Sequence, residues 1–391
     1  MKNRLLLSIA VLSAIFTASC NKAPTGYIES HAEEIPGSVN WFSSGAYCNA
    51  VHLNRRYIAR SGNLVFMAVL NNSTSAVVND IYVKDGDAAW VKHPVSAAIT
   101  YAANVYILGG VLHIVGNQSD YSYAFTSAAD FLANTPSILT TTNTGSQFPD
   151  TTAVHINYGS VYRYSAWGPV DVSDGTTWSY SGSITSTHNA TDRAIICGSN
   201  TLHMALLAQG FDAGVNYFNL YFYDGVTAWN TAVQEPIAQS TFGTCSGLYY
   251  DTDKNQYHML INCSDMSTSW DKSFHGVYDV STASFSGFQP VTIPGINNET
   301  SSMVMIKAGG KLFIAIGLAG NVYLQSLSSG KSYLIGDFCD MPSVFTADPS
   351  TGTSETESYV DLLILSNSGG SFPNVKNYYV RLDRAQLAAL D

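Results

Sequence analysis

The sequence predicts an all-β protein built from seven similar units of four short strands, and three observations support this prediction. Only 12% of the 391 residues are charged, whereas Ser, Thr, Asn, Gly and Tyr are abundant. This composition suits short strands and turns better than amphipathic helices, so we expect almost no helix. A strand–turn–strand pattern recurs at intervals of about fifty residues. An Asp-Gly turn followed by Trp recurs beside it.

The first segment of the chain has the features of a signal peptide. Lys2 and Arg4 precede an apolar run at 5–16. This run is too short to span a bilayer and has the length of a signal-peptide core. We therefore expect residues 1–19 to be removed from the mature protein.

The residues TASC at 17–20 resemble the lipobox of bacterial lipoproteins, although Thr17 replaces the usual Leu. The resemblance implies cleavage before Cys20 and lipidation of its thiol, and Asn21 implies the outer membrane. A bacterial outer-membrane lipoprotein, facing the periplasm or the cell surface, is the expectation. If Cys20 is not lipidated, the alternative is a secreted protein.

Charge excludes one class of partner. Removal of residues 1–19 takes away two basic side chains and no acidic one, which leaves 16 basic against 29 acidic residues and a formal charge of −13. Because no basic stripe is present to displace phosphate counterions, nucleic acid is not an expected partner. The expected contact with the membrane is through the lipid anchor alone, and no cofactor is expected.

The repeated units are hairpins in which a tight turn precedes an anchoring apolar or aromatic residue. The copies include YIARSGNLVFMAV, VYILGGVLHIVG and MIKAGGKLFIAIG, and the seven anchors lie 41 to 55 residues apart. The anchors are Leu64, Leu112, Val161, Leu202, Tyr257, Leu312 and Tyr359. Seven units of this length are typical of a β-propeller with seven four-stranded blades.

The Asp-Gly turns belong between the third and fourth strands of a blade. In the clear copies we expect Asp to hydrogen-bond its own turn, Gly to take positive φ, and Trp to pack between blades. These copies are Asp85-Gly86 with Trp90, Asp174-Gly175 with Trp178, and Asp224-Gly225 with Trp229. The degenerate copies carry Phe131, Phe285 and Tyr333 in place of Trp.

Two repeat families resemble these segments. YDGVTAWNTAVQEP and YDVSTASFSGFQP are similar to the last hairpin of kelch repeats, and DGTTW is similar to a truncated sialidase Asp-box. The kelch Gly pair and the full Ser-x-Asp-x-Gly order of the Asp-box are both missing. The resemblance covers nearly all of residues 40 to 391 and implies a propeller.

The seventh unit runs out of chain before its outer strand. We expect VNWFSS at 39–44 to supply that strand, with Trp41 as the aromatic, because such closure removes an exposed sheet edge. The C-terminal RAQLAALD is the competing source. The expected organisation is therefore a signal peptide at 1–19, a lipidated tether at 20–38 and the propeller at 39–391.

Two cysteines bracket a predicted hairpin. Cys245 and Cys263 flank a strand, the polar turn DTDKN and a second strand, so we expect them to face each other and to form a disulfide in an oxidising envelope. The alternative is a pair of buried thiols. The sequence has no Cys/His cluster with zinc spacing, and no metal is expected.

Two arginines are the candidate ligand-binding residues. Arg55 and Arg193 each lie nine residues before an anchor, near the start of an innermost strand, where a propeller has its axial funnel. Guanidinium groups at this place can bind a carboxylate. Sialidases use an arginine cluster in this region, but their Phe-Arg-Ile-Pro motif is absent. The alternative is that both arginines are rim residues paired with acids such as Asp192.

Other candidate chemistry is weaker. His113, His203 and His258 each follow an anchor by one residue, a position that favours packing between blades over a metal site. No complete catalytic motif is present, so we assign no catalytic residue. The leading interpretation is an envelope lipoprotein whose propeller binds a glycan or another envelope protein. The alternatives are a sialidase-like glycan-active enzyme and a structural subunit of a surface assembly.

Overall fold

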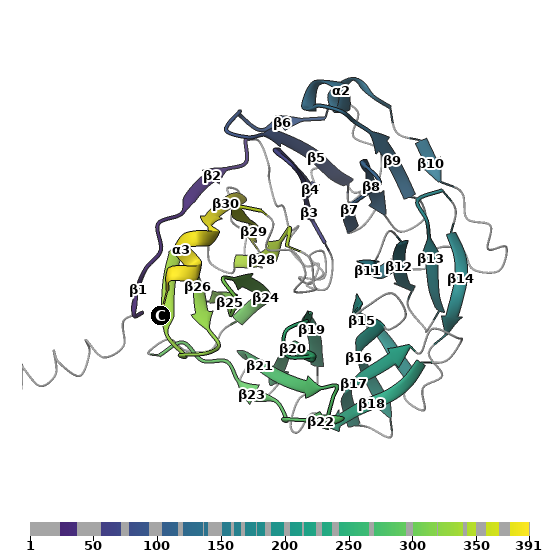
Figure 1. The fold of residues 1–391 in the computed structure, drawn as a ribbon, viewed down its shortest axis with the longest axis vertical. Helices are drawn as coiled ribbons and strands as arrows, with labels where there is room; N and C mark the ends of the chain where they lie inside the picture. Colours follow the sequence, from purple (N-terminus) through teal and green to yellow (C-terminus); the bar gives the residue numbers. More distant parts are fainter. Residues whose placement is uncertain are drawn as a thin grey trace, which may run out of the picture.

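The computed structural model describes most of the chain after residue 23. The described ranges are 24–36, 56–71, 78–93, 104–115, 120–135, 137–139, 151–157, 160–165, 169–176, 178–183, 189–198, 204–212, 215–223, 229–236, 242–265, 270–294, 300–318, 320–338, 342–348, 357–366 and 376–390. Within these ranges the strands form seven sheets that surround a common axis (Figure 1). The predicted seven-bladed β-propeller is confirmed.

The first four blades follow the chain, and each runs from an inner strand to an outer strand. Blade 1 contains β3 (Ile58–Ser61), β4 (Leu64–Asn71), β5 (Val78–Asp85) and β6 (Val91–Lys92). Blade 2 contains β7 (Asn104–Leu108), β8 (Val111–Val115), β9 (Asp120–Ala124) and β10 (Ser137–Leu139). Blade 3 contains β11 (Thr151–Asn157), β12 (Ser160–Ser165), β13 (Pro169–Ser173) and β14 (Trp178–Ser183). Blade 4 contains β15 (Asn189–Gly198), β16 (Met204–Asp212), β17 (Val215–Tyr223) and β18 (Trp229–Pro236).

The last three blades include strands beyond the regular four or strands from the N-terminal segment. Blade 5 contains β19 (Phe242–Asp251), β20 (Gln256–Asp265) and β21 (Trp270–Asp279), with β22 (Ser284–Phe285) and β23 (Gln289–Pro290) both pairing with β21. Blade 6 contains β24 (Thr300–Ala308), β25 (Lys311–Leu318), β26 (Asn321–Ser326) and β27 (Ser332–Asp337). Blade 7 contains β28 (Pro342–Thr346), β29 (Tyr359–Ser366) and β30 (Tyr378–Asp383).

The N-terminal segment completes blades 6 and 7. Strand β2 (His31–Glu34) pairs antiparallel with β30 as the outer strand of blade 7, and β1 (Gly26–Tyr27) pairs parallel with β27. Closure by the N-terminal side is therefore correct, but the strand is 31–34, and the predicted strand at 39–44 lies outside the described residues. The prediction of a tether at 20–38 is wrong for residues 26–27 and 31–34, which are strands of the propeller. The physical reason is that β30 would otherwise present an exposed sheet edge.

Neighbouring inner strands contact one another all the way around the ring, including β28 with β3. Small polar side chains strengthen these contacts. The backbone N–H of Met303 donates to Oγ of Ser246 at 3.1 Å, which joins blades 6 and 5. The backbone N–H of Val344 donates to Oγ of Ser302 at 2.5 Å, which joins blades 7 and 6. The ring is thus closed by specific bonds as well as by apolar packing.

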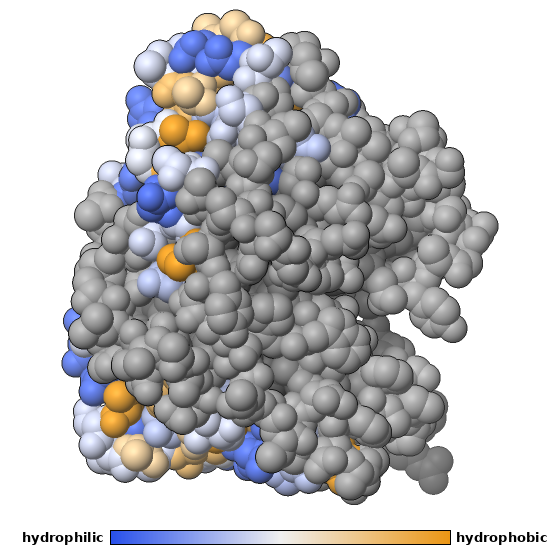
Figure 2. Space-filling view, turned by 90° about the vertical axis from the view of Figure 1, so that its right-hand side faces the viewer, coloured by the Kyte–Doolittle hydropathy of each residue, from blue (hydrophilic) through white to orange (hydrophobic). Residues whose placement is uncertain are grey.

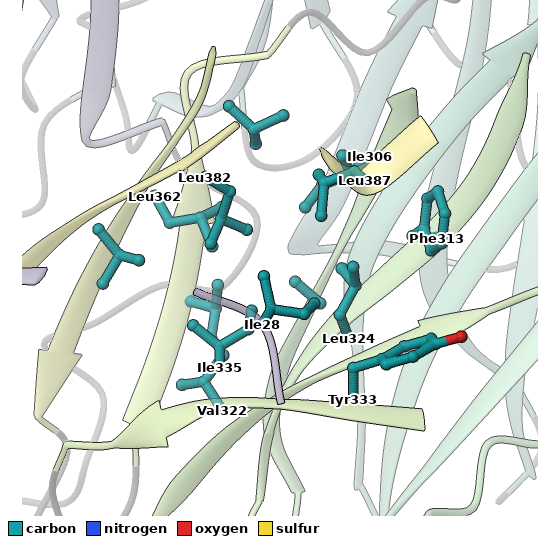
Figure 3. Packing of buried hydrophobic residues seen from close by; sticks show 14 of the residues in the cluster. Ile28, Ile306, Phe313, Val322, Leu324, Tyr333, Ile335, Leu362, Leu382 and Leu387 are labelled. Atoms are coloured by element: carbon teal, nitrogen blue, oxygen red, sulfur yellow. The ribbon is translucent and has the colours of Figure 1, made fainter. Parts of the chain in front are cut away.

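Apolar side chains fill the spaces between blades. Figure 3 shows the cluster between blades 6 and 7, where Ile28 from the N-terminal segment packs among residues of both sheets and of the C-terminal helix. Its labelled members are Ile28, Ile306, Phe313, Val322, Leu324, Tyr333, Ile335, Leu362, Leu382 and Leu387. Ile28 is only 4% exposed, so the N-terminal segment is part of the core and not only of the sheet edge.

The predicted positive φ is confirmed at both described glycines, the turn hydrogen bond at Asp174 and the packing between blades at Trp90. Gly86 and Gly175 have φ values of +53° and +98°. The carboxylate of Asp174 accepts hydrogen bonds from N–H and Oγ1 of Thr176, at 3.0 and 2.6 Å. Trp90 is buried between blades 1 and 7. The turn at 224–228 lies outside the described residues.

Two short helices occur in the described part of the chain. Helix α2 (Ala128–Ala133) carries Phe131, whose aromatic packing role was predicted but on a strand. Helix α3 (Arg384–Ala389) is the C-terminal segment that was the competing source of the missing strand. Instead it packs on the turn of blade 6, where a Cβ on Gly309 would meet Cβ of Ala388 at 2.5 Å, so this contact requires glycine.

Candidate functional site

The two ends of the propeller differ in their connections. At one end, called here the turn end, inner strands connect to second strands and third strands to outer strands, through links of two residues at 62–63 and 309–310 and of twelve residues at 125–136 and 347–358. At the other end, called here the loop end, the chain passes between blades, and eleven residues separate β6 from β7 and β10 from β11. Connections often carry binding residues, and all of the connections between blades lie at the loop end, so we take the loop end as the candidate site.

The structure describes the two predicted arginines only in part. Arg193 lies in β15 between Ala190 and Ala194, where the pairing of β15 with β16 shifts its register. This shift interrupts the ladder near the loop-end start of an inner strand, and such irregularities reorient side chains. The side chain of Arg193 and the whole of Arg55 lie outside the described atoms. The structure therefore neither brings the two guanidinium groups together nor separates them.

Arg56 is a described cation at the loop-end start of blade 1 that the sequence analysis did not single out. Its backbone N–H donates to Oδ1 of Asn104 at 3.0 Å, and its carbonyl accepts from N–H of Val105 at 2.7 Å. Its Nη2 donates to the carbonyl oxygen of Asp348 at 3.4 Å. The guanidinium group of Arg56 thus contacts the segment that follows β28 of blade 7, on the turn-end side of that strand. The sequence feature that could have identified Arg56 is its position next to Arg55, since the two form an Arg-Arg pair.

Buried ion pairs join the same two blades at the turn end. Arg60 of β3 binds the carboxylate of Asp361 in β29 through Nε and Nη2, the second bond being 2.8 Å long. The hydroxyl of Tyr379 donates to the same carboxylate. Burial, followed by the charge of Asp361, raises the pKa of Tyr379 well above its usual range. Tyr379 therefore stays protonated as a donor to Asp361.

A second set of ion pairs ties the C-terminal helix to the ring. Arg384 donates through Nη2 to both carboxylate oxygens of Asp348, each at 3.0 Å, and through Nε to the carbonyl of Glu357 at 2.9 Å. Burial raises the pKa of Asp348 to about 6 despite the opposing charge of Arg384. A separate ion pair joins blades 6 and 5, where Nζ of Lys307 lies 2.6 Å from Oδ2 of Asp253. These charged groups hold blades together, which assigns them a structural role.

His113 and His258 are buried, and their described hydrogen bonds each lie within one blade, whereas His203 lies outside the described residues. Nδ1 of His113 and the hydroxyl of Tyr106 both contact the buried carboxylate of Asp120 at 3.2 Å, within blade 2. His258 and His275 share a hydrogen bond of 2.9 Å between Nδ1 and Nε2. Burial lowers their pKa values to about 3 and about 4. In the described ranges, no group of three His, Cys, Asp or Glu side chains is arranged to hold a metal.

The prediction that Cys245 and Cys263 face each other is wrong. In the ladder between β19 and β20, Cys245 faces Ile261 and Cys263 faces Gly243. Such diagonal positions are about 7–8 Å apart, beyond the usual Cα separation in a disulfide. Both are buried thiols in the apolar cluster between blades 4 and 5. The register therefore does not favour the predicted disulfide.

The described surface is mixed in character. In the side view of Figure 2, hydrophilic and hydrophobic residues alternate over the described part of that face. The large apolar residues that are most exposed are far apart in the chain: Tyr27, Val91, Val215, Val280 and Tyr359. In the described ranges, none of the helices has the length and hydropathy needed to cross a bilayer.

Comparison with known proteins establishes the fold alone. No family model and no curated protein matches the chain. Among solved structures, an ulvan lyase of family PL25 bound to -[GlcA(1-4)Rha3S]- is similar, with a TM-score of 0.57 and 10% identity over 93% of this chain and 96% of that chain. YCF48 bound to a D1 peptide has a TM-score of 0.51 and 11% identity over 92% and 98%. The Pan2 WD40 domain of Neurospora crassa has a TM-score of 0.51 and 10% identity over 91% and 97%.

Proposed function

We propose that this protein is a lipid-anchored envelope protein whose propeller binds a polar ligand at its loop end. The observation that carries the proposal is the contrast between the two ends. At the turn end, the described ion pairs Arg60–Asp361 and Lys307–Asp253 join neighbouring blades, and Arg384–Asp348 ties helix α3 to blade 7. Arg55 directly precedes the first described residue of blade 1 in the sequence, and Arg193 is the fifth residue of β15, the inner strand of blade 4.

The proposed ligand carries acidic or hydroxyl groups. A guanidinium group presents donors in a planar fork that matches a carboxylate or a sulfate, and Arg55 and Arg193 supply two such groups in the proposal. The ulvan lyase of similar fold is bound to -[GlcA(1-4)Rha3S]-, which contains an acidic sugar. We therefore place acidic glycans first and an envelope protein second, since YCF48 is bound to a D1 peptide.

A glycan-active enzyme is the second candidate, favoured by the similarity to polysaccharide lyases with TM-scores of 0.57 and 0.54. For a hydrolase it would require two carboxylates about 5 to 9 Å apart at the loop end. Sequence candidates are Asp150, Asp192, Glu299 and Glu355, and their side chains lie outside the described atoms. The leading proposal remains binding without turnover.

The proposed location is the bacterial outer membrane, with Cys20 as the lipidated residue. It is supported by the apolar segment at 5–16 and the lipobox-like residues at 17–20. A secreted protein is the alternative if the thiol of Cys20 carries no lipid. The intact mass of protein extracted from a bacterial envelope separates these two cases.

The test of function is an incubation of residues 21–391 with acidic and neutral oligosaccharides. The melting temperature and any released sugars are measured together. A melting shift without product is the expected result. Product release would replace the proposal with the enzyme, and the absence of both signals with every glycan would contradict a glycan ligand and leave a protein partner as the class to test.

A further inference from the structure

The chain joins the propeller at a defined place on the outer edge of blade 6. The backbone N–H of Thr25 donates to the carbonyl of Ser332 at 2.6 Å, and N–H of Ser332 donates to Oγ1 of Thr25 at 3.3 Å. Gly26 then pairs with Tyr333, and N–H of Ile28 donates to the carbonyl of Leu334 at 3.0 Å. The segment is held against blade 6 from Thr25 onward.

This junction lies at the turn end of the propeller. Ser332 is the first residue of β27 and directly follows the turn at 327–331, which connects the third strand of blade 6 to its outer strand. That turn is at the same end as the link at 309–310 in the same blade. Figure 1 shows β1 on the outside of the ring, close to α3 and the C-terminus.

Little chain separates this junction from the proposed lipid anchor. Five residues, 21–25, lie between Cys20 and Gly26. Cys20 and Gly26 are six residue steps apart, which span about 22 Å at most when fully extended. Because the lipid on a modified cysteine is embedded in the bilayer, Cys20 lies at the membrane surface, and Gly26 must lie within this short distance of it.

We infer that the turn end of blade 6 rests against the bilayer surface and that the loop end faces away from it. The inference depends on the proposed anchoring through Cys20. It places Arg193, on the loop-end side, in the space beyond the membrane surface. The partner at the turn end is the lipid headgroup region itself.

The surface chemistry at the junction fits this partner. Tyr27 is 78% exposed, although Ile28 beside it is buried in the core. An aromatic ring with a hydroxyl group is favoured at a membrane–water interface, where one part contacts acyl chains and the other stays hydrated. Exposed Lys331 precedes Ser332 on the adjacent strand and is suited to contact an anionic headgroup, while exposed Glu29 lies two residues past Tyr27.

The experiment uses the full chain, processed and acylated in bacteria, in vesicles of phosphatidylethanolamine and phosphatidylglycerol. A photoreactive benzoylphenylalanine replaces either Tyr27 or Val215. Val215 is the matched control because it is 37% exposed and begins β17 at the loop end of blade 4. At least a tenfold excess of lipid adduct at position 27 is expected. Equal adducts, or an excess at position 215, would overturn the orientation.

A second variant separates the anchor from the orientation. A flexible insert of about twenty Gly and Ser residues between Ala23 and Pro24 lengthens the connection several-fold. We expect the adduct at position 27 to fall at least threefold while the acyl mass on Cys20 is kept. An undiminished adduct would contradict the role of the short connection. A chain without the acyl mass overturns the anchor and the orientation together, whereas an acylated chain with equal adducts overturns the orientation alone.

Discussion

Trp90 of blade 1 packs edge-to-face against Tyr379 of blade 7, with ring centroids 5.1 Å apart and ring planes at 73°. This contact closes the ring between its first and last blades. The N-terminal segment supports it, because Glu33 pairs with Tyr379 across the sheet and its carboxylate accepts from Nζ of Lys84 at 2.9 Å. Lys84 in turn lies 5.9 Å from the centroid of the Trp90 ring.

Replacement of this tryptophan tests the closure. Trp90→Ala removes a large buried ring and is expected to lower the free energy of unfolding by about 3–5 kcal/mol. Val91→Ala is the matched control, since Val91 is 45% exposed and its loss is expected to change stability by less than about 0.5 kcal/mol. Urea denaturation followed by fluorescence measures both variants. Equal stability of the two would mean that the seam does not depend on Trp90.

A second pair of neighbours tests whether the N-terminal segment belongs to the core. Ile28→Ala is expected to cost about 2–5 kcal/mol, because Ile28 is buried between blades 6 and 7. Tyr27→Ala, at an exposed position one residue away, is expected to cost less than about 0.5 kcal/mol. Calorimetric melting of the two variants is the measurement. If residues 20–38 were only a tether, neither substitution would affect melting.

Arg384 of the C-terminal helix can be compared with Arg381 of the preceding strand, which serves as its control. Arg384→Ala leaves the carboxylate of Asp348 buried without its ion pair, and a loss of about 3–5 kcal/mol is expected. Arg381→Ala breaks a pair with the exposed carboxylate of Asp87 and is expected to cost about 1 kcal/mol or less. Urea unfolding at neutral pH distinguishes them. A smaller loss for Arg384→Ala than for Arg381→Ala would contradict the structural role.

The buried histidine pair predicts acid sensitivity. The pKa values of His258 and His275 are lowered by burial to about 3 and about 4. Below about pH 6.5 these histidines bind protons in the unfolded chain but not in the folded chain. The free energy of unfolding therefore falls as the pH is lowered from 6.5 toward 4. The slope from each histidine is at most about 1.4 kcal/mol per pH unit.

The control for that prediction is a variant without the pair. A His258→Leu/His275→Leu protein is expected to lose less stability between pH 6.5 and 4 than the unaltered protein. Asp348 acts in the opposite direction, because its raised pKa of about 6 makes stability fall as the pH rises from about 4 to 6. Since Asp348 is present in both proteins, its effect cancels in the difference. Parallel pH profiles would contradict the prediction.

The repeat period made the blades predictable, since each unit must bury its apolar faces against neighbours. The anchors of blades 1, 2 and 6 are the first or second residues of second strands in the structure: Leu64, Leu112 and Leu312. The N-terminal closure was harder to predict. Two residues at 26–27 and four at 31–34 form strands too short to show a period of their own, and pairing with β27 and β30 determines them.

The turn-end ion pairs had a signal that the sequence analysis did not use. Single charged residues occur within otherwise apolar strands, as Arg60 in YIARS, Lys307 in MVMIKA and Asp361 in YVDLLIL. Such residues require buried partners, because an unpaired charge in a core is strongly destabilising. Which residues pair across blades depends on the positions of separate sheets, and a period within one blade carries no information about that.

The most direct test of the proposed function compares ligand stabilisation in the unaltered protein and in an Arg55→Ala/Arg193→Ala double variant, with Arg381→Ala as the control. The melting temperature is measured with saturating acidic oligosaccharide. A rise of a few degrees in the unaltered protein and the control, and its loss in the double variant, is the predicted result. An equal rise in all three proteins would contradict the assignment of ligand binding to Arg55 and Arg193.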